Sequence, residues 1–163
     1  MASGSDEVTI RPARLGDADA MVAITAEVFG PYAIDRMIEE MIGRPDGATW
    51  VDIKARSIRR AIEHGLGSCF VAELGGRVVG FATAAINAVA ERGTIDDLAV
   101  AADCQKRGVG RRLIAAAVER FRELGLKQAK IETLTCNEAG RHLYPAAGFR
   151  EVARQIHYVM PLD

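Results

Sequence analysis

Hydrophobic side chains recur every three or four residues over five stretches of the chain, which is the spacing of one helix face. The predicted helices run from the N-cap signal Gly16-Asp17 to Gly30, and over about 34–42, 52–64, 109–124 and 137–147. The fourth of these carries an apolar stripe from Val109 to Leu124, and Gly125 follows in the position of a C-terminal cap. Each helix therefore has one face that must pack against another layer.

Other stretches alternate apolar and polar residues and are rich in β-branched side chains, which predicts strands. These strands cover about 8–11, 68–74, 77–87, 93–100 and 129–135, with a last strand or hairpin over 149–160. Gly75-Gly76 joins two of them as a two-residue hairpin turn. The order is one strand, three helices, three strands, helix, strand, helix and a final strand region. It predicts an α/β sandwich built on a mixed sheet.

Composition adds that the chain is an ordinary globular protein. Of its 163 residues, 49% are hydrophobic and 26% are charged, which suits one domain over residues 8–163. Residues 1–7 are small or polar, and we expect them to be disordered. There are 21 basic and 22 acidic residues, so bulk charge gives no argument for nucleic acid or an anionic membrane as a partner.

Targeting signals are also missing from the sequence. The longest apolar run, 113–118, is too short to cross a bilayer, and the N-terminus has neither a basic nor an apolar signal region. Cys69, Cys104 and Cys136 are odd in number and widely spaced, which indicates neither a disulfide framework nor a zinc knuckle. We therefore expect a cytoplasmic protein that binds no membrane.

Several common catalytic motifs do not occur. The chain has no GxxxxGK[ST] phosphate loop, no GxSxG and no HExxH. Gly108-Val109-Gly110 begins a dinucleotide fingerprint, but Leu113 stands where its third glycine would be. The three histidines lie far apart without metal-ligand spacing, so we expect no metal.

One loop has the chemistry of an anion site. A predicted strand ends at Val100, and the loop after it opens into the helix that begins near Val109. The first turn of a helix has free N–H groups and partial positive charge, and glycines let a phosphate approach the backbone. Cationic side chains surround the two glycines; the candidate residues are Gln105, Lys106, Arg107, Gly108, Val109, Gly110, Arg111 and Arg112.

Two motifs in this part of the chain resemble those of a known family. The segment Gln105-Lys106-Arg107-Gly108-Val109-Gly110, after a strand ending Leu98-Ala99-Val100, resembles the acetyl-CoA-binding signature of the GNAT superfamily of N-acetyltransferases. The segment 137–149, with Asn137, Ala139, Leu143-Tyr144 and Gly148-Phe149, is similar to a later motif of that superfamily. The resemblance implies a mixed sheet of about six to seven strands, whose two parallel central strands splay apart, with helices on both faces.

The resemblance also assigns roles to residues around acetyl-CoA. The backbone of Leu98, Ala99 and Val100 is expected to bond the cofactor arm and to polarise the thioester carbonyl. The loop from Gln105 to Arg112 is expected to hold the pyrophosphate. Asn137 is expected to bond the cofactor arm, although an N-cap of the helix that follows explains it equally well.

The implied reaction needs a base. A primary amine with a pKa of ~10 is mostly protonated at neutral pH, so a carboxylate must take a proton directly or through water. Asp97 matches an acidic position of some small-amine and aminoglycoside acetyltransferases and is preferred, with Asp96 second and Glu91 as a further candidate. Strand alternation predicts that Asp96 and Asp97 point to opposite faces, so that only one of them faces the substrate.

Tyr144 matches the residue that the family uses at the departing thiolate. A phenol with a pKa of ~10 is a weaker acid than a thiol with one of ~8.5, so a hydrogen bond to the sulfur is the expected role. A packed aromatic ring is the alternative interpretation.

The sequence thus predicts an acetyl-CoA-dependent N-acetyltransferase that acts by direct transfer in a ternary complex. An acyltransferase for a longer acyl-CoA and a non-catalytic acyl-CoA-binding or regulatory module remain alternatives. The amine acceptor, a small molecule or a protein amine, is not identified. Residues 30–66 are its expected wall, and Asp35, Glu39 and Glu40 could attract a cation there or form a solvated face. A homodimer is also possible.

Overall fold

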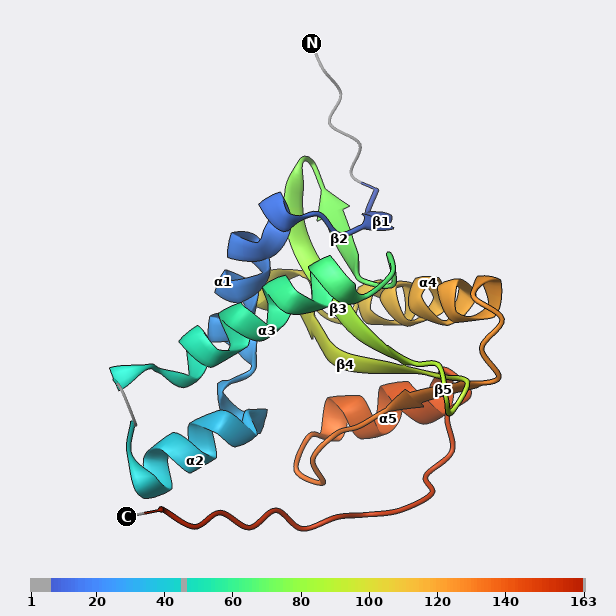
Figure 1. The fold of residues 1–163 in the computed structure, drawn as a ribbon. Helices are drawn as coiled ribbons and strands as arrows, with labels where there is room; N and C mark the ends of the chain where they lie inside the picture. Colours follow the sequence, from blue (N-terminus) through green and yellow to red (C-terminus); the bar gives the residue numbers. More distant parts are fainter. Residues whose placement is uncertain (1–6, 45–46, 163) are drawn as a thin grey trace.

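A five-stranded sheet forms the centre of the protein, in a computed structural model that describes residues 7–44 and 47–162. Its strands are β1 (Thr9–Pro12), β2 (Phe70–Leu74), β3 (Arg77–Asn87), β4 (Arg92–Val100) and β5 (Gln128–Ile131), in that spatial order. The first four are antiparallel to their neighbours, whereas β5 runs parallel to β4 (Figure 1). The mixed sheet predicted from the sequence is confirmed.

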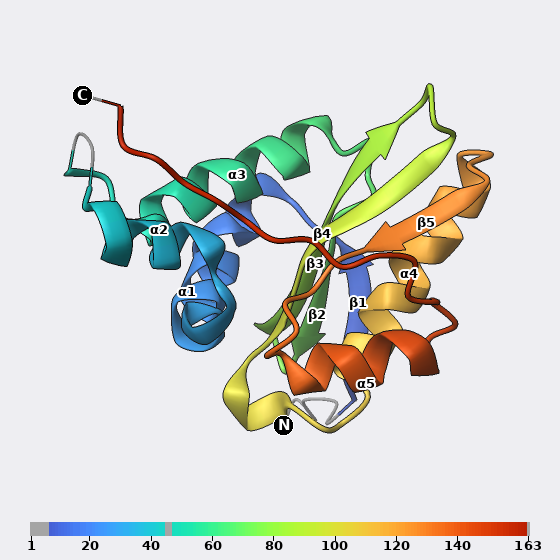
Figure 2. The same cartoon turned by 90° about the horizontal axis from the view of Figure 1, so that it is seen from below.

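Helices cover both faces of this sheet. On one side lie α1 (Ala18–Val28) and α3 (Trp50–His64), with α2 (Ile34–Ile42) beside them, and on the other lie α4 (Val109–Glu123) and α5 (Glu138–Ala146) (Figure 2). Two apolar clusters result. Val71, Phe81 and Ala99 pack with α1 and α3, and Ala82 and Ile95 pack with α4. Alternate residues of one strand therefore fill separate cores, as strand geometry requires.

Local signals in the sequence account for several element boundaries. Thr49 and Asp52 form a reciprocal capping box, which starts α3 at Trp50, two residues before the predicted start. The hairpin turn at Gly75-Gly76 is confirmed, with positive φ at both residues. At Gly93 a Cβ would lie 2.4 Å from the ring of Phe121, so only glycine lets β4 pack this closely on α4.

The end of the chain differs from the prediction. Residues 149–160 form no strand, and residues 150–162 are exposed throughout, so the described residues contain five strands rather than six to seven. The predicted alternation is present, with exposed Val152, Ile156 and Tyr158, but these side chains contact no sheet face that would bury them. Of the segment expected to be disordered, residues 1–6 lie outside the described residues.

Strand β5 is also shorter than the predicted 129–135. It pairs with β4 only from Arg92↔Gln128 to Ile95↔Ile131, whereas β4 continues to pair with β3 as far as Val100. The two parallel strands therefore diverge after Ile95, which confirms the expected splay. This fork positions the candidate site.

Across the described ranges, 7–44 and 47–162, no helix is both long enough and apolar enough to cross a membrane.

Candidate functional site

The fork between β4 and β5 leaves one edge of β4 open. Within the described residues, positions 97–100 pair with β3 and have no partner on the side of β5. Leu98 and Val100 pack against the α4 cluster, and the side chain of Ala99 is buried on the opposite face. Leu98, Ala99 and Val100 can therefore offer a ligand only main-chain groups. Such groups suit an extended molecule that has amides of its own.

A β-bulge in β4 lies at the mouth of this fork. Thr83 of β3 is paired with Asp97, while the next residue, Ala84, is paired with Ile95. Asp96 is thus the extra residue that has no partner across the ladder, and a bulge of this kind interrupts the alternation of side chains.

The bulge overturns the prediction that the two aspartates point to opposite faces. Asp97 bonds to Lys54 of α3, and Asp96 lines a pocket together with Ser57 and Arg60 of the same helix. Both carboxylates therefore lie on the α3 side of the sheet. Ile95, immediately before them, packs on the α4 side.

Asp97 is fully engaged within the protein. One carboxylate oxygen accepts a hydrogen bond from Lys54 Nζ at 2.8 Å, and the other accepts one from the Thr83 hydroxyl at 2.9 Å. The residue is 6% exposed. Lys54 also lies over the ring of Phe29, 5.9 Å from its centroid. A carboxylate held by these bonds is poorly placed to accept a substrate proton.

Asp96 has the opposite environment. Its carboxylate is exposed to the pocket, and desolvation raises its pKa to about 6, with the negative charge of Asp97 adding to the shift and Lys54 opposing it. Such a group is ionised at neutral pH and takes up a proton more readily than an ordinary aspartate. Glu91, the third candidate, lies five residues earlier in the turn before β4, about 16 Å away along an extended strand.

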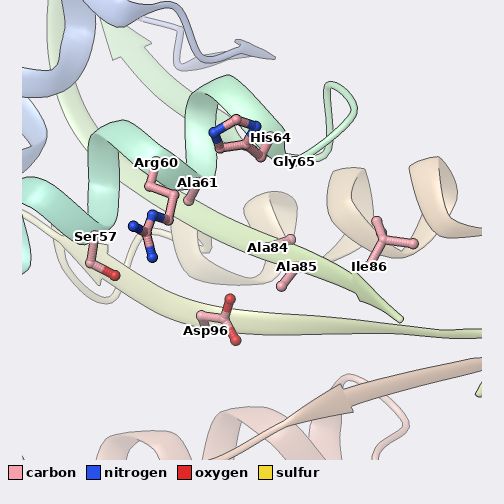
Figure 3. Close-up of a pocket in the computed structure, with 9 residues that line it drawn as sticks. All are labelled: Ser57, Arg60, Ala61, His64, Gly65, Ala84, Ala85, Ile86 and Asp96. Atoms are coloured by element: carbon pink, nitrogen blue, oxygen red, sulfur yellow. The ribbon is translucent and has the colours of Figure 1, made fainter. Parts of the chain in front are cut away.

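The pocket beside Asp96 has a volume of about 290 Å³ and lies between α3 and strands β3 and β4 (Figure 3). Ala61 and Gly65 of α3 and its C-terminal cap, with Ala84 and Ala85 of β3, provide small side chains that leave the space open. Ser57, Arg60, His64 and Asp96 are its polar lining residues. The pocket thus combines an acidic group on the sheet with basic groups on the helix.

The predicted anion loop connects the end of β4 to α4. The Gln105 side chain donates a hydrogen bond to the Val100 carbonyl at 3.1 Å and ties the loop to the strand. Lys106 and Gly108 have positive φ values, +61° and +76°. Gly108 adopts this conformation without strain because it has no Cβ. No side chain of the described residues caps α4, which begins at Val109. Its first N–H groups therefore remain available to an anion.

Cationic side chains surround this helix start. Lys106, Arg107, Arg111 and Arg112 are all exposed. The Arg111 guanidinium also donates to the Ala146 carbonyl at 3.3 Å and so connects α4 to α5. Backbone donors with nearby positive charge form a site whose chemistry fits a pyrophosphate group.

On α5, the side chains of Asn137 and Tyr144 lie around Gly140. The Asn137 side chain accepts a hydrogen bond from the Gly140 N–H at 3.1 Å and donates one to Thr133 Oγ1 at 3.0 Å, so it caps the helix. A Cβ on Gly140 would lie 2.9 Å from Thr133 Oγ1 and 3.3 Å from the Tyr144 ring. Burial raises the pKa of the Tyr144 phenol, and a hydrogen bond with Thr133 partly opposes the shift.

The residues that α3 contributes fall within the expected acceptor wall, residues 30–66, but sequence reasoning did not single them out. Lys54, Ser57, Ala61 and His64 are spaced three and four apart, which places them on one helix face, and Arg60 lies beside them. That spacing is visible in the sequence, but it does not reveal which strand residues the face meets. Two of the three acidic residues expected as a wall are engaged elsewhere, because Glu39 bonds to Arg44 and to the Trp50 N–H, and Glu40 pairs with Arg36.

In the described segments 7–44 and 47–162, no group of three or more His, Cys, Asp or Glu side chains could hold a metal ion.

Comparison with known proteins agrees with this geometry. The profile of the acetyltransferase (GNAT) family matches residues 33–149. Over 67 residues the chain is 36% identical to mycothiol acetyltransferase from Propionibacterium freudenreichii subsp. shermanii, a match that covers 41% of this chain and 22% of that protein.

Solved structures share the fold across nearly the whole chain. The PaiA N-acetyltransferase of Thermoplasma acidophilum in complex with coenzyme A superposes with a TM-score of 0.68 at 14% identity, covering 88% of this chain and 90% of that one. An aminoglycoside acetyltransferase from an uncultured soil metagenomic sample gives a TM-score of 0.65 at 18% identity, over 98% and 99% of the two chains. The ribosomal-protein-S18-alanine N-acetyltransferase of Escherichia coli gives 0.64 at 19% identity, over 90% and 80%. At these identities the likeness establishes the fold alone.

Proposed function

Because the chain belongs to the GNAT acetyltransferase family, we propose that it transfers the acetyl group of acetyl-CoA to a primary amine, by direct attack in a ternary complex. The observation that carries the proposal is the fork after Ile95. Strand β4 and the loop that joins it to α4 carry three features in succession: the carboxylate of Asp96, the open edge of the strand and the anion loop.

The cofactor would lie along that edge. Apart from the Val100 carbonyl, which accepts from Gln105, the main chain of Leu98, Ala99 and Val100 would offer strand groups to the amides of the pantetheine arm. The loop from Gln105 to Arg112 would bind the pyrophosphate through the N–H groups at the start of α4 and the exposed cations around it. Because Asn137 caps α5, any contact it makes with the cofactor arm would add to that role.

We propose Asp96 as the general base in preference to Asp97. Asp96 faces the pocket with a pKa of about 6, whereas both oxygens of Asp97 are bonded within the protein. Asp96 would accept the proton from the ammonium group, directly or through water, so that the amine can attack the thioester carbon. Asp97 then serves to hold Lys54 and the bulge in position.

The remaining steps stabilise charge. A backbone N–H between Leu98 and Val100 would donate to the oxyanion that forms as the amine adds to the carbonyl. Tyr144 would donate a hydrogen bond to the thiolate sulfur as the C–S bond breaks. Since burial raises the pKa of Tyr144, hydrogen bonding suits this phenol better than complete proton transfer.

The test measures binding and turnover separately. Acetyl-CoA at about 100 times its Kd should stabilise the fold by about 2.7 kcal/mol, seen as a higher melting temperature. A panel of amines should then release free CoA thiol, counted against a reaction without amine. Stabilisation without thiol release from any amine would instead favour a non-catalytic acyl-CoA-binding module. Stronger turnover with longer acyl-CoA would identify a different acyl donor.

A further inference from the structure

The pocket that contains Asp96 has a basic wall opposite that carboxylate. Ser57, Arg60 and His64 are spaced three and four residues apart, so α3 presents them together. Figure 3 shows the Arg60 side chain extending from α3 toward the strand that carries Asp96. A base and a cation thus line one small cavity from two different elements.

Unlike Lys54 and Arg59 of the same helix, Arg60 has no partner among the described residues. Arg59 pairs with Asp19 at 2.7 Å, and Lys54 pairs with Asp97 at 2.8 Å. Arg60 forms no hydrogen bond or ion pair with the described part of the chain, Asp96 included, although both residues line the pocket. The two opposite charges face the same space without neutralising each other.

The surroundings do not favour a polycation at this position. Two of the three acids of α2 are used within the protein, with Glu39 bonded to Arg44 and the Trp50 N–H, and Glu40 paired with Arg36 at 2.9 Å. A molecule with several ammonium groups would meet Arg60 with only the Asp96 carboxylate to balance it.

Building on the acetyltransferase activity proposed above, we infer that the acceptor is a small amine that also carries an anionic group. Its amine would lie at Asp96 and its anion at Arg60, with the Ser57 hydroxyl and His64 as further donors. A guanidinium binds a carboxylate or a phosphate through two parallel hydrogen bonds, which would fix the orientation of the amine. The volume of about 290 Å³ lies at the low end for small-molecule sites and suits an acceptor of this size.

Two matched pairs of amines test this inference. β-Alanine differs from β-alaninamide, and O-phosphoethanolamine from ethanolamine, in the anionic group. We expect the anionic member of one pair to be preferred in kcat/KM by roughly 10-fold, the size of one charge-assisted hydrogen bond. The pair that shows the preference distinguishes a carboxylate from a phosphate.

The variant Arg60→Gln should bring that preference close to one, while Arg59→Gln should retain it, because Arg59 pairs with Asp19 outside the pocket. Comparing the ratio between enzymes removes the effect of the different amine pKa values within each pair. Arg60 is exposed, so the variant should fold, and the acetyl-CoA-induced rise in melting temperature checks that it does.

The outcomes separate this inference from the proposed function. Equal turnover within both pairs, an unchanged preference in Arg60→Gln, or a clear preference for the polycation spermidine would overturn the inference and leave acetyl transfer intact. Absence of thiol release with all five amines, while acetyl-CoA still raises the melting temperature, would overturn the proposed function and this inference with it.

Discussion

The ammonium nitrogen of Lys54 lies 2.8 Å from a carboxylate oxygen of Asp97, and this ion pair connects α3 to β4 beside the fork. The pair is largely withdrawn from solvent, with side-chain exposures of 23% and 6%. Since Asp97 also accepts a hydrogen bond from Thr83 of β3, three elements meet at one carboxylate. The contact occupies Asp97 and leaves its neighbour Asp96 as the free carboxylate of the pocket.

Removing Lys54 should affect both stability and activity. Lys54→Met leaves the buried Asp97 without its cation, so we expect a loss of about 3 kcal/mol in the free energy of unfolding, measured by urea denaturation. Lys54 also lowers the pKa of Asp96, so the acid limb of kcat/KM should move to higher pH in the variant. Lys54→Arg keeps the charge and is the control; an equal shift in both variants would contradict an electrostatic cause.

Exchanging each aspartate for asparagine identifies the base. Asp96→Asn should lower kcat/KM by about 10²–10⁴, with partial recovery at high pH, where solvent supplies the neutral amine. Wild-type kcat/KM should rise with pH through about 6 as Asp96 ionises, and Asp96→Asn should lack this limb.

Asp97→Asn is the matched comparison, since it breaks the ion pair with Lys54 but leaves Asp96 in the pocket. We expect it to reduce stability and to keep the pH limb near 6. If Asp97→Asn loses activity and Asp96→Asn keeps it, Asp97 is the base. If both variants keep normal activity, the proton is accepted by Glu91 or by water.

How far the sequence predicts this molecule depends on which interactions define each element. The helices were predicted within about two residues, because amphipathic spacing and signals such as the Thr49-Asp52 box are local. The loop between β4 and α4 was also predicted in place, since its glycines and cations are contiguous, and its anion-binding role stays a prediction. The match of the family profile confirms the resemblance.

The bulge at Asp96 could not be predicted in this way. Whether a residue is extra in a strand depends on its register with the partner, here Thr83 and Ala84, and no local pattern at Asp96-Asp97 encodes it. The prediction of a last strand over 149–160 was wrong for a related reason. Alternation through residues 150–162 fits a strand, but alternation alone does not provide a neighbour to pair with.

The charge of the anion loop can be tested at Gly108. Gly108→Asp should abolish the acetyl-CoA-induced rise in melting temperature, because it places a carboxylate at the start of α4 where the pyrophosphate would bind. Gly108→Asn introduces a side chain of the same shape at the same positive φ without the charge, and should retain part of the rise. Equal loss in the two variants would assign the effect to backbone strain.

Tyr144→Phe tests the leaving-group contact. Loss of the hydroxyl should lower kcat by about 10–10³-fold, while the Kd for acetyl-CoA, measured by calorimetry, changes little. Because the pKa of Tyr144 is raised above its ordinary value, wild type and variant should show the same pH dependence up to about pH 9. Thr133→Val, which removes the neighbouring hydroxyl, should have a smaller effect on kcat. Full activity in Tyr144→Phe would reduce Tyr144 to a packing role.

Asp96 should also lower stability at neutral pH. Its pKa is about 6 in the folded protein against ~3.9 in an unfolded chain, so the unfolded state releases its proton first as the pH rises. Well below pH 4 the group is protonated in both states and costs nothing, whereas above pH 6 the full cost of ionising it in the fold is present. Asp96→Asn should therefore raise the melting temperature at pH 7.5 and raise it much less at pH 4. Since Asp96 is exposed, solvent screening will keep the gain small. A variant no more stable than wild type at pH 7.5 would mean that Asp96 titrates as an ordinary surface aspartate, which would also weaken its assignment as the base.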